Sequence, residues 1–98
     1  MFDEIAFDIS TMCDFSGRAD TMVHRFASFH IMLQENGVLY ISSHDEVYKQ
    51  ALGKAGFSEV FEMRVRDLGG NTTVDMLDFP PDYIILVAIK RRMELISN

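Results

Sequence analysis

The segment Asp82–Lys90 (DYIILVAIK) is the most apolar stretch of the chain, and it limits the possible folds more than any other feature. A continuous apolar run of this length is typical of a strand that is covered on both faces. We therefore expect it to lie in the middle of a sheet. A helix needs about 20 apolar residues to span a bilayer, so the run does not predict a membrane segment.

Three further segments have the pattern of strands. Phe2–Ile9 alternates apolar and polar residues, which predicts a strand with one buried face. Val38–Ser42 is short, apolar and rich in strand-forming residues, which predicts a buried strand. Val60–Arg66 places a charged residue at every second position of its later part, which is typical of a half-exposed strand at a sheet edge.

Two segments between these strands have helical spacing. Arg18–Gln34 has apolar residues at every third or fourth position, which predicts a helix. Most sides of this helix are apolar, so we expect most of its surface to be buried. Gly37 is suited to end that helix. A second helix is expected to begin with Ser43 as its cap, paired with Glu46 in a capping box, and to end at Gly56.

The predicted element order is β-α-β-α-β-β, an α/β fold that forms a single domain over residues 1–98. Strand–helix–strand connections are almost always right-handed, so the first three strands should be parallel. Acidic residues outnumber basic ones by 15 to 9, which gives a net charge of −6 and argues against non-specific nucleic-acid binding. The basic cluster Lys90–Arg92 is expected to be a solvated strand end.

Four segments follow one another in an order that resembles a known family: FDEIAFD (2–8), FHIMLQENGVLYIS (29–42), ALGKAGFSEV (51–60) and the pair VFEMRVRDLGG (60–70) with DFPPDYIILVAIK (78–90). Together they resemble the C-terminal half of the class I S-adenosylmethionine-dependent methyltransferases. The resemblance implies a three-layer, Rossmann-like half-domain whose antiparallel last strand inserts between its neighbours. The implied four-stranded mixed sheet has the order 1-2-4-3, with the last strand central and the third at an edge.

The half of that family's fold that binds the cofactor has no counterpart in this sequence. The family's first three strands carry a glycine-rich turn, and no Gly-x-Gly-x-Gly pattern occurs in the chain. S-adenosylmethionine is therefore a cofactor by resemblance alone, and the residues leave open that none is bound. The sheet would also end at Phe2–Ile9 with an exposed edge. We expect a second copy or another chain to cover that edge and the first helix.

Asp8 is the strongest candidate for a catalytic residue. Ligands of open α/β sheets bind outside the carboxyl ends of the strands, and Asp8 lies at such an end. The resemblance implies contact with the substrate, a metal or the methyl-donor end of the cofactor. The alternative is a polar residue that caps the following loop.

Ser10 and Thr11 follow the first strand, and Ser42 and His44 follow the second, so these residues are expected to line a substrate or cofactor edge beside Asp8. A group such as Ser10–His44–Asp8 could act in nucleophilic catalysis. The sequence contains no Gly-x-Ser-x-Gly pattern to support it. Cys13 with His44 is a similar and equally unsupported pair.

His24 and His30 lie six positions apart, which does not place them on one helix face, so no metal site is predicted. Cys13 is the single cysteine and excludes an intrachain disulfide. No segment resembles a signal peptide, so a cytoplasmic location is expected.

The sequence leaves three functions open. The first is a methyltransferase-type enzyme whose cofactor half comes from its own dimer or from a partner chain. The second is a non-catalytic, dimeric interaction module derived from a methyltransferase. The third is a truncated piece of a longer, active methyltransferase. In each case no nucleic acid or membrane partner is predicted.

Overall fold

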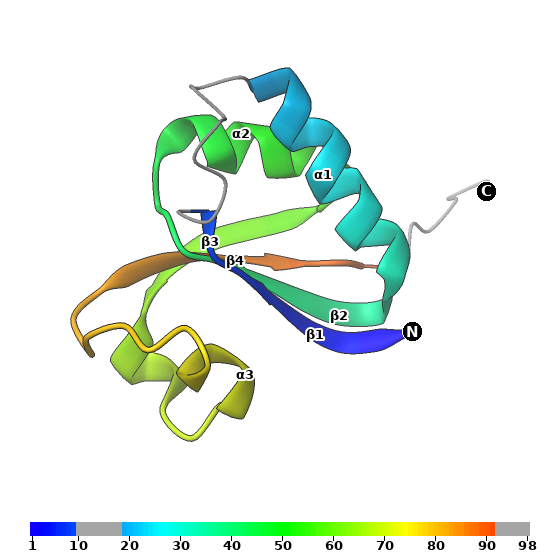
Figure 1. The fold of residues 1–98 in the computed structure, drawn as a ribbon. Coiled ribbons are helices and arrows are strands. Elements are labelled where there is room, and N and C mark those ends of the chain that lie inside the picture. Colours follow the sequence, from blue (N-terminus) through cyan, green and yellow to red (C-terminus); the bar gives the residue numbers. More distant parts are fainter. Residues whose placement is uncertain (10–18, 92–98) are drawn as a thin grey trace.

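A computed structural model describes residues 1–9 and 19–91 and shows an α/β fold built on one four-stranded sheet (Figure 1). The strand order is β1-β2-β4-β3, with β1 parallel to β2 and with β4 antiparallel to both of its neighbours. The strands are β1 (Phe2–Phe7), β2 (Leu33–Ile41), β3 (Glu59–Arg64) and β4 (Ile84–Ile89).

The sheet confirms the predicted order 1-2-4-3 and the antiparallel last strand. Four consecutive residues in the middle of β4 are buried, as expected for a strand with neighbours on both sides and with side chains covered on both faces. β3 pairs only with β4 and forms one edge, as its alternating pattern predicted. It ends at Arg64 rather than Arg66, because Val65–Leu68 forms a 3-10 helix, η2.

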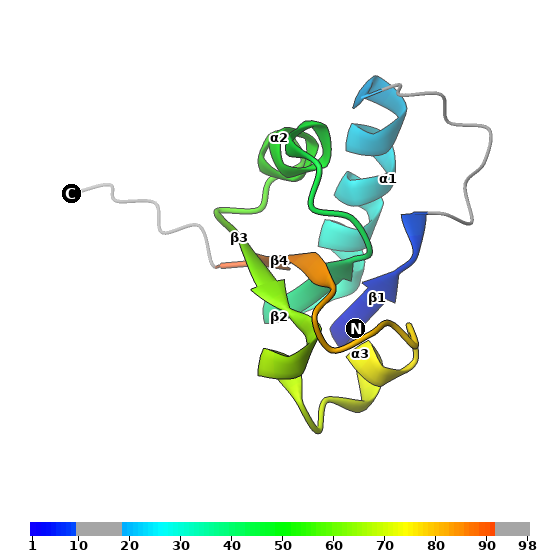
Figure 2. The same ribbon diagram turned by 90° about the vertical axis from the view of Figure 1, so that its left-hand side faces the viewer.

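The two faces of the sheet are covered unequally. Figures 1 and 2 show the long helix α1 (Ala19–Met32) and helix α2 (Glu46–Lys54) together on one face. The other face is covered by η2 and by the short helix α3 (Thr72–Asp75). Helical segments thus lie on both faces, but among the described residues the second layer is short.

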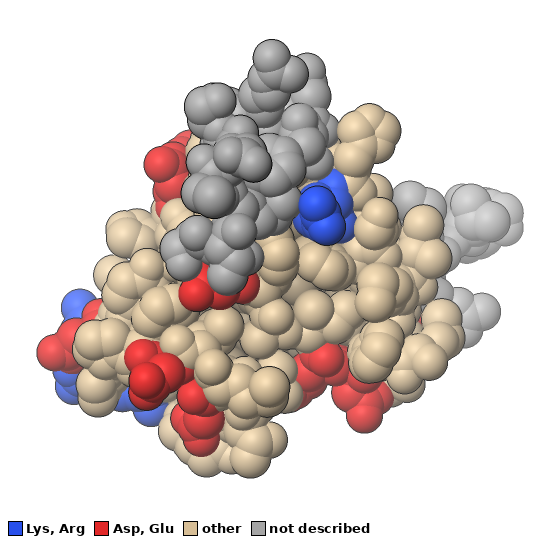
Figure 3. All heavy atoms as spheres, viewed as in Figure 1, with Lys and Arg blue, Asp and Glu red and all other residues tan. Residues whose placement is uncertain are grey.

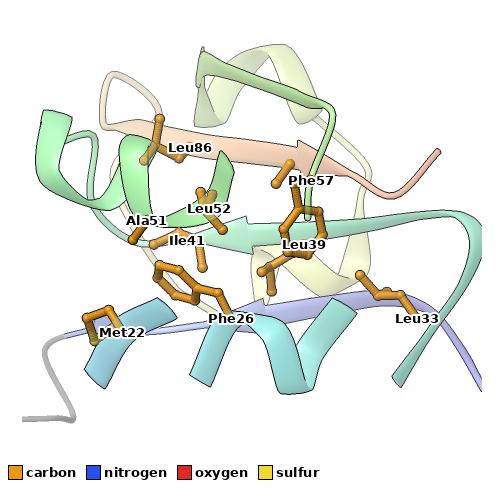
Figure 4. Close-up of a cluster of buried hydrophobic side chains, with 10 residues drawn as sticks. Met22, Phe26, Leu33, Leu39, Ile41, Ala51, Leu52, Phe57 and Leu86 are labelled. Carbon is orange, nitrogen blue, oxygen red and sulfur yellow. The ribbon is translucent and has the colours of Figure 1, made fainter. Parts of the chain in front are cut away.

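Alternation along the strands divides the core into two clusters. Leu39 and Ile41 face α1 and α2, whereas Tyr40 between them faces α3. β4 alternates in the same way. The cluster under α1 and α2 is the larger one (Figure 4) and contains Met22, Phe26, Leu33, Leu39, Ile41, Ala51, Leu52, Phe57, Leu86 and Ala88. The cluster under α3 contains Tyr40, Val74, Ile85 and Val87.

The start of α2 differs from the prediction. Its cap is Asp45 rather than Ser43: the Asp45 carboxylate accepts a hydrogen bond from the Val47 N–H at 3.1 Å. The Ser43 hydroxyl instead accepts a hydrogen bond from the Asp45 N–H at 3.2 Å, which forms the turn before the helix. At the other end, Gly56 has a φ of 115° and ends the helix as predicted.

The expectation that Gly37 ends the first helix is wrong. α1 ends at Met32, and Gly37 lies inside β2, at a point where the pairing of β1 with β2 shifts in register. A Cβ atom at Gly37 would lie 2.8 Å from the carbonyl oxygen of Gln34 and 2.9 Å from the Leu33 side chain. The close approach of the Gln34 carbonyl and the Leu33 side chain therefore favours glycine here.

The end of α1 is bound to the end of β4. The Lys90 ammonium group donates to the carbonyl oxygens of His30 at 2.8 Å and Leu33 at 2.7 Å. These carbonyls lie where the helical hydrogen-bond pattern stops, so a cation satisfies them particularly well. No helix among the described residues is long and apolar enough to cross a membrane.

Gly37→Ala is expected to lower the free energy of unfolding by about 1–3 kcal/mol, because the added methyl group collides with backbone that cannot move away cheaply. Gly53→Ala is the matched control. A Cβ atom at Gly53 meets nothing within 4 Å, and the residue lies in a helix. It should stabilise the protein by about 0.5–1 kcal/mol. Urea unfolding of both variants measures the difference, and equal effects would contradict the close contact assigned at Gly37.

Candidate functional site

Asp8 and Ser42 meet at the carboxyl ends of β1 and β2. The parallel pairing of these strands brings the residues that follow them to the same edge. The Ser42 hydroxyl donates to the Asp8 carboxylate at 3.0 Å and accepts a hydrogen bond from the Ile9 N–H at 2.7 Å. The Ser42 side chain is almost fully buried, with 4% exposed. Ser42 therefore joins the two strand ends and orients the carboxylate.

The same edge is tied to β4 through Tyr83. Its hydroxyl donates to the carbonyl oxygen of Ser42 at 2.7 Å. The Tyr83 ring stacks on Phe79 with 4.4 Å between ring centroids, in the segment that leads into β4. Hydrogen bonds thus connect the ends of β1 and β2 with the entry to β4.

The structure brings together only part of the predicted edge. Asp8 and Ser42 are in contact, whereas His44 is exposed and lies just before the cap of α2. Ser10 and Thr11 lie outside the described residues, as does Cys13. A carboxylate oriented by a buried hydroxyl can also bind a ligand, through a further hydrogen bond or through a cationic group. The same contacts also suit a structural role in joining two strands.

Ser42→Ala should lower the free energy of unfolding by about 1–3 kcal/mol, because the Ile9 N–H would lose its acceptor in a partly buried position. Ser28→Ala serves as the control, since its exposed hydroxyl bonds only a carbonyl one turn away in α1. That variant should change the stability by less than about 0.5 kcal/mol. Chemical denaturation measures both values, and an unchanged Ser42→Ala protein would contradict the role assigned to Ser42.

A second polar cluster, which the sequence did not predict, joins Glu4, Tyr40 and Asn71. The Tyr40 hydroxyl donates to the Glu4 carboxylate at 3.1 Å. The Asn71 amide donates to the same carboxylate at 3.3 Å and to the Tyr40 oxygen at 2.9 Å. Asn71 also caps α3, because its side-chain oxygen Oδ1 accepts a hydrogen bond from the Val74 N–H at 3.0 Å. One signal was available: a tyrosine in a buried strand usually needs a partner for its hydroxyl.

Burial raises the pKa of Tyr40 to about 12, and the negative charge of Glu4 and its hydrogen bond contribute in the same direction. The hydrogen bond from Asn71 opposes them. Because the ordinary pKa of tyrosine is about 10, the phenol stays protonated in the folded protein where it would ionise in an unfolded chain. Neutral pH lies well below both values, so the Tyr40 hydroxyl is protonated there and donates to Glu4.

Ionisation of Tyr40 should be visible in an ultraviolet titration of the folded protein. The absorbance change that Tyr40→Phe removes is expected near pH 12, and Glu4→Gln should move it to lower pH. The contribution of this group to stability is constant below about pH 10. It is lost as the pH rises toward 12, because the unfolded state releases the proton first. A Tyr40 transition at its ordinary value would contradict the assigned environment.

An open hollow of about 610 Å³ lies beside this cluster, near the start of β1 and the register shift in β2. Its lining is polar and acidic, and it consists of Asp3, Glu4, Gln34, Glu35, Asn36, Val38 and Thr73. It is lined by the amino-terminal part of β1, whereas Asp8 follows the carboxyl end. Within residues 1–9 and 19–91, no group of three or more His, Cys, Asp or Glu side chains could hold a metal ion.

The described part of the basic cluster Lys90–Arg92 is bound within the chain. Lys90 donates to the carbonyls at the end of α1, and Arg91 contacts Glu59 and donates to the side-chain oxygen of Asn36 at 3.0 Å. The Lys90 ammonium group thus bonds within the chain, which differs from the expected solvated strand end, whereas Arg91 is exposed as expected. On the face drawn in Figure 3, red acidic side chains are spread over several places and few blue basic ones are visible.

No family model, curated protein or solved structure matches the chain. The proposal that follows is therefore supported by the sequence resemblance and by the geometry of the described residues.

Proposed function

We propose that the chain is a methyltransferase-like domain that corresponds to the C-terminal half of the class I fold and that binds no S-adenosylmethionine by itself. Its role is that of a scaffold whose β1 edge is completed by a second copy or by a partner chain. The observation that supports this most directly is the sheet order β1-β2-β4-β3, with an antiparallel β4 between two strands that are parallel to each other. The resemblance implies the same insertion.

The position of β1 supports the second part of the proposal. β1 is the end strand of the sheet, and its first residues are exposed. In the family that the sequence resembles, the sheet would continue beyond this strand into the glycine-rich half. Nothing in the sequence has the Gly-x-Gly-x-Gly pattern of that half. An end strand with unpaired backbone groups is a ready template for another strand.

The contact between Asp8 and Ser42 favours an enzyme as a second candidate. A buried hydroxyl orients this carboxylate at the strand edge where ligands of open α/β sheets bind. In such an enzyme Asp8 would hold the methyl acceptor or the donor end of the cofactor. Catalysis would still require a second surface to position the donor against the acceptor.

Calorimetric titration with S-adenosylhomocysteine distinguishes the two candidates. The proposal predicts no saturable heat from the folded chain, because half of the positioning surface is absent from it. Saturable binding would contradict the proposal and support the enzyme.

The matched variants Asp8→Asn and Glu35→Gln then locate any binding that is observed. Both replace a carboxylate by an amide, but Glu35 lies at the acidic hollow near the start of β1. Loss of binding in Asp8→Asn alone would place the ligand at the carboxyl ends of the strands. Loss in Glu35→Gln alone would place it at the hollow. Circular dichroism of each variant confirms that it is folded.

A further inference from the structure

Alternate residues of β1 direct their backbone groups away from β2. The Phe7 carbonyl accepts a hydrogen bond from the Ser42 N–H at 3.1 Å, and the Ile9 N–H donates to the Ser42 hydroxyl. The odd-numbered residues therefore turn their backbone groups toward β2. Because these groups point alternately to the two sides of a strand, Glu4 and Ala6 direct theirs to the outer edge. No other described strand pairs with that edge.

A second copy of the chain can pair with this edge about a two-fold axis perpendicular to the sheet. Such an axis keeps each residue on its own face, so a residue lies opposite one of the same parity. The outward groups of Glu4 and Ala6 then exchange hydrogen bonds with those of the other copy, as in an antiparallel ladder. The possible registers differ in which residues lie opposite each other.

The charges and the length of β1 together select one of these registers. A register centred on Phe7 sets no carboxylate against another, but it would pair Ile5 and Ala6 with residues 9 and 8, beyond the end of the strand at Phe7. A shift that places Glu4 opposite Glu4, or opposite Asp8, sets carboxylates directly against each other, which is destabilising. With Ile5 on the axis, Glu4 lies opposite Ala6 and Asp3 lies opposite Phe7. No carboxylate then faces another. Glu4 is also held toward its own chain by Tyr40 and Asn71.

An apolar surface on α1 lies on the same face as the axis residue. The Phe29 ring packs on Phe7 of β1 with 5.0 Å between ring centroids, and Ile5 belongs to the same core cluster. Phe29 and Met32, together with the polar residues His24, Arg25 and Ser28, line a groove of about 370 Å³ along α1. Met32 is 42% exposed and its neighbour Ile31 is 72% exposed, although the helix was expected to be buried on most sides.

From the outward backbone groups, the charge pattern and this exposed apolar surface, we infer that the chain pairs with a second copy of itself, antiparallel through β1, with Ile5 on the two-fold axis. The inference rests on the proposed function and names the partner at the β1 edge. The sheets of the two copies join into one continuous sheet. Their α1 helices lie on the same face of the joined sheet, where Met32 becomes covered.

Sedimentation equilibrium at micromolar concentrations tests the dimer with a matched pair of proline variants. Ala6→Pro removes an outward N–H of β1 without removing a bond to β2, and its ring blocks the edge. Directly after β3, the Val65 N–H donates to the Tyr83 carbonyl. The odd-numbered residues of β3 therefore turn their backbone groups toward β4, and Glu62 turns its backbone groups outward. Glu62→Pro therefore makes the same change at the opposite edge of the sheet.

The expected result is a dimer for the natural chain and for Glu62→Pro, and a folded monomer for Ala6→Pro. A monomeric natural chain would overturn the inference, as would a dimer that survives in folded Ala6→Pro. Loss of the dimer in both variants would also overturn it, because the contact would then not be specific to β1.

Disulfide formation tests the register and does not depend on the proline variants. In a Cys13→Ser background, Ile5→Cys places thiols on the axis, at a separation of about 5 Å between the Cα atoms, which a disulfide can bridge. Oxidation should link this variant into covalent dimers, whereas Asp3→Cys should remain monomeric on a denaturing gel. Preferential linking of Glu4→Cys would indicate the shifted register and overturn the inference.

These outcomes are distinct from those of the proposed function. A monomeric protein in sedimentation would contradict pairing with a second copy, but it would be compatible with a different chain at the β1 edge. Saturable binding of S-adenosylhomocysteine overturns the proposed function whether the protein is monomeric or dimeric.

Discussion

The insertion of β4 between β2 and β3 is the constraint on which the rest of the structure depends. β4 supplies buried side chains to both core clusters: Leu86 and Ala88 face α1 and α2, and Ile85 and Val87 face α3. Because an apolar strand of this kind must be covered on both faces and paired on both sides, it determines where every other element can lie. β1 and β3 are consequently left at the two ends of the sheet.

This arrangement also explains why polar contacts concentrate at the strand ends and beside α3. The sheet interior is apolar, so the carboxylates of Glu4 and Asp8 are bound where a hydroxyl or an amide reaches them. Asp8 is held by Ser42, and Glu4 is held by Tyr40 and Asn71. A neutral donor thus holds each of these carboxylates in a defined orientation. A ligand at either place would meet a carboxylate that is already oriented.

Most of the fold could be predicted from the sequence. Hydrophobic patterns over whole segments predicted the central position of Asp82–Lys90 and the edge position of Val60–Arg66, and the family resemblance implied the full strand order. The local details could not. Asp45 and Ser43 both suit a helix cap, and only the geometry of the turn decides between them. A glycine such as Gly37 can end a helix, and it can equally occupy a position in a strand where no Cβ atom fits. For the site, adjacency of Asp8 and Ser42 followed from parallel strands, whereas the partnership of Glu4 with Asn71 spans 67 positions and left no local signal.

The contact of Lys90 with the end of α1 has a consequence for the order in which the chain folds. Lys90 lies 60 positions after His30 and 57 after Leu33, whose carbonyls it satisfies. When α1 leaves the ribosome, the cation that completes its last turn has not yet been synthesised. The core under α1 also lacks Leu86 and Ala88 at that stage. The helix can therefore reach its final stability only after β4 has emerged, so long-range contacts decide when this fold forms.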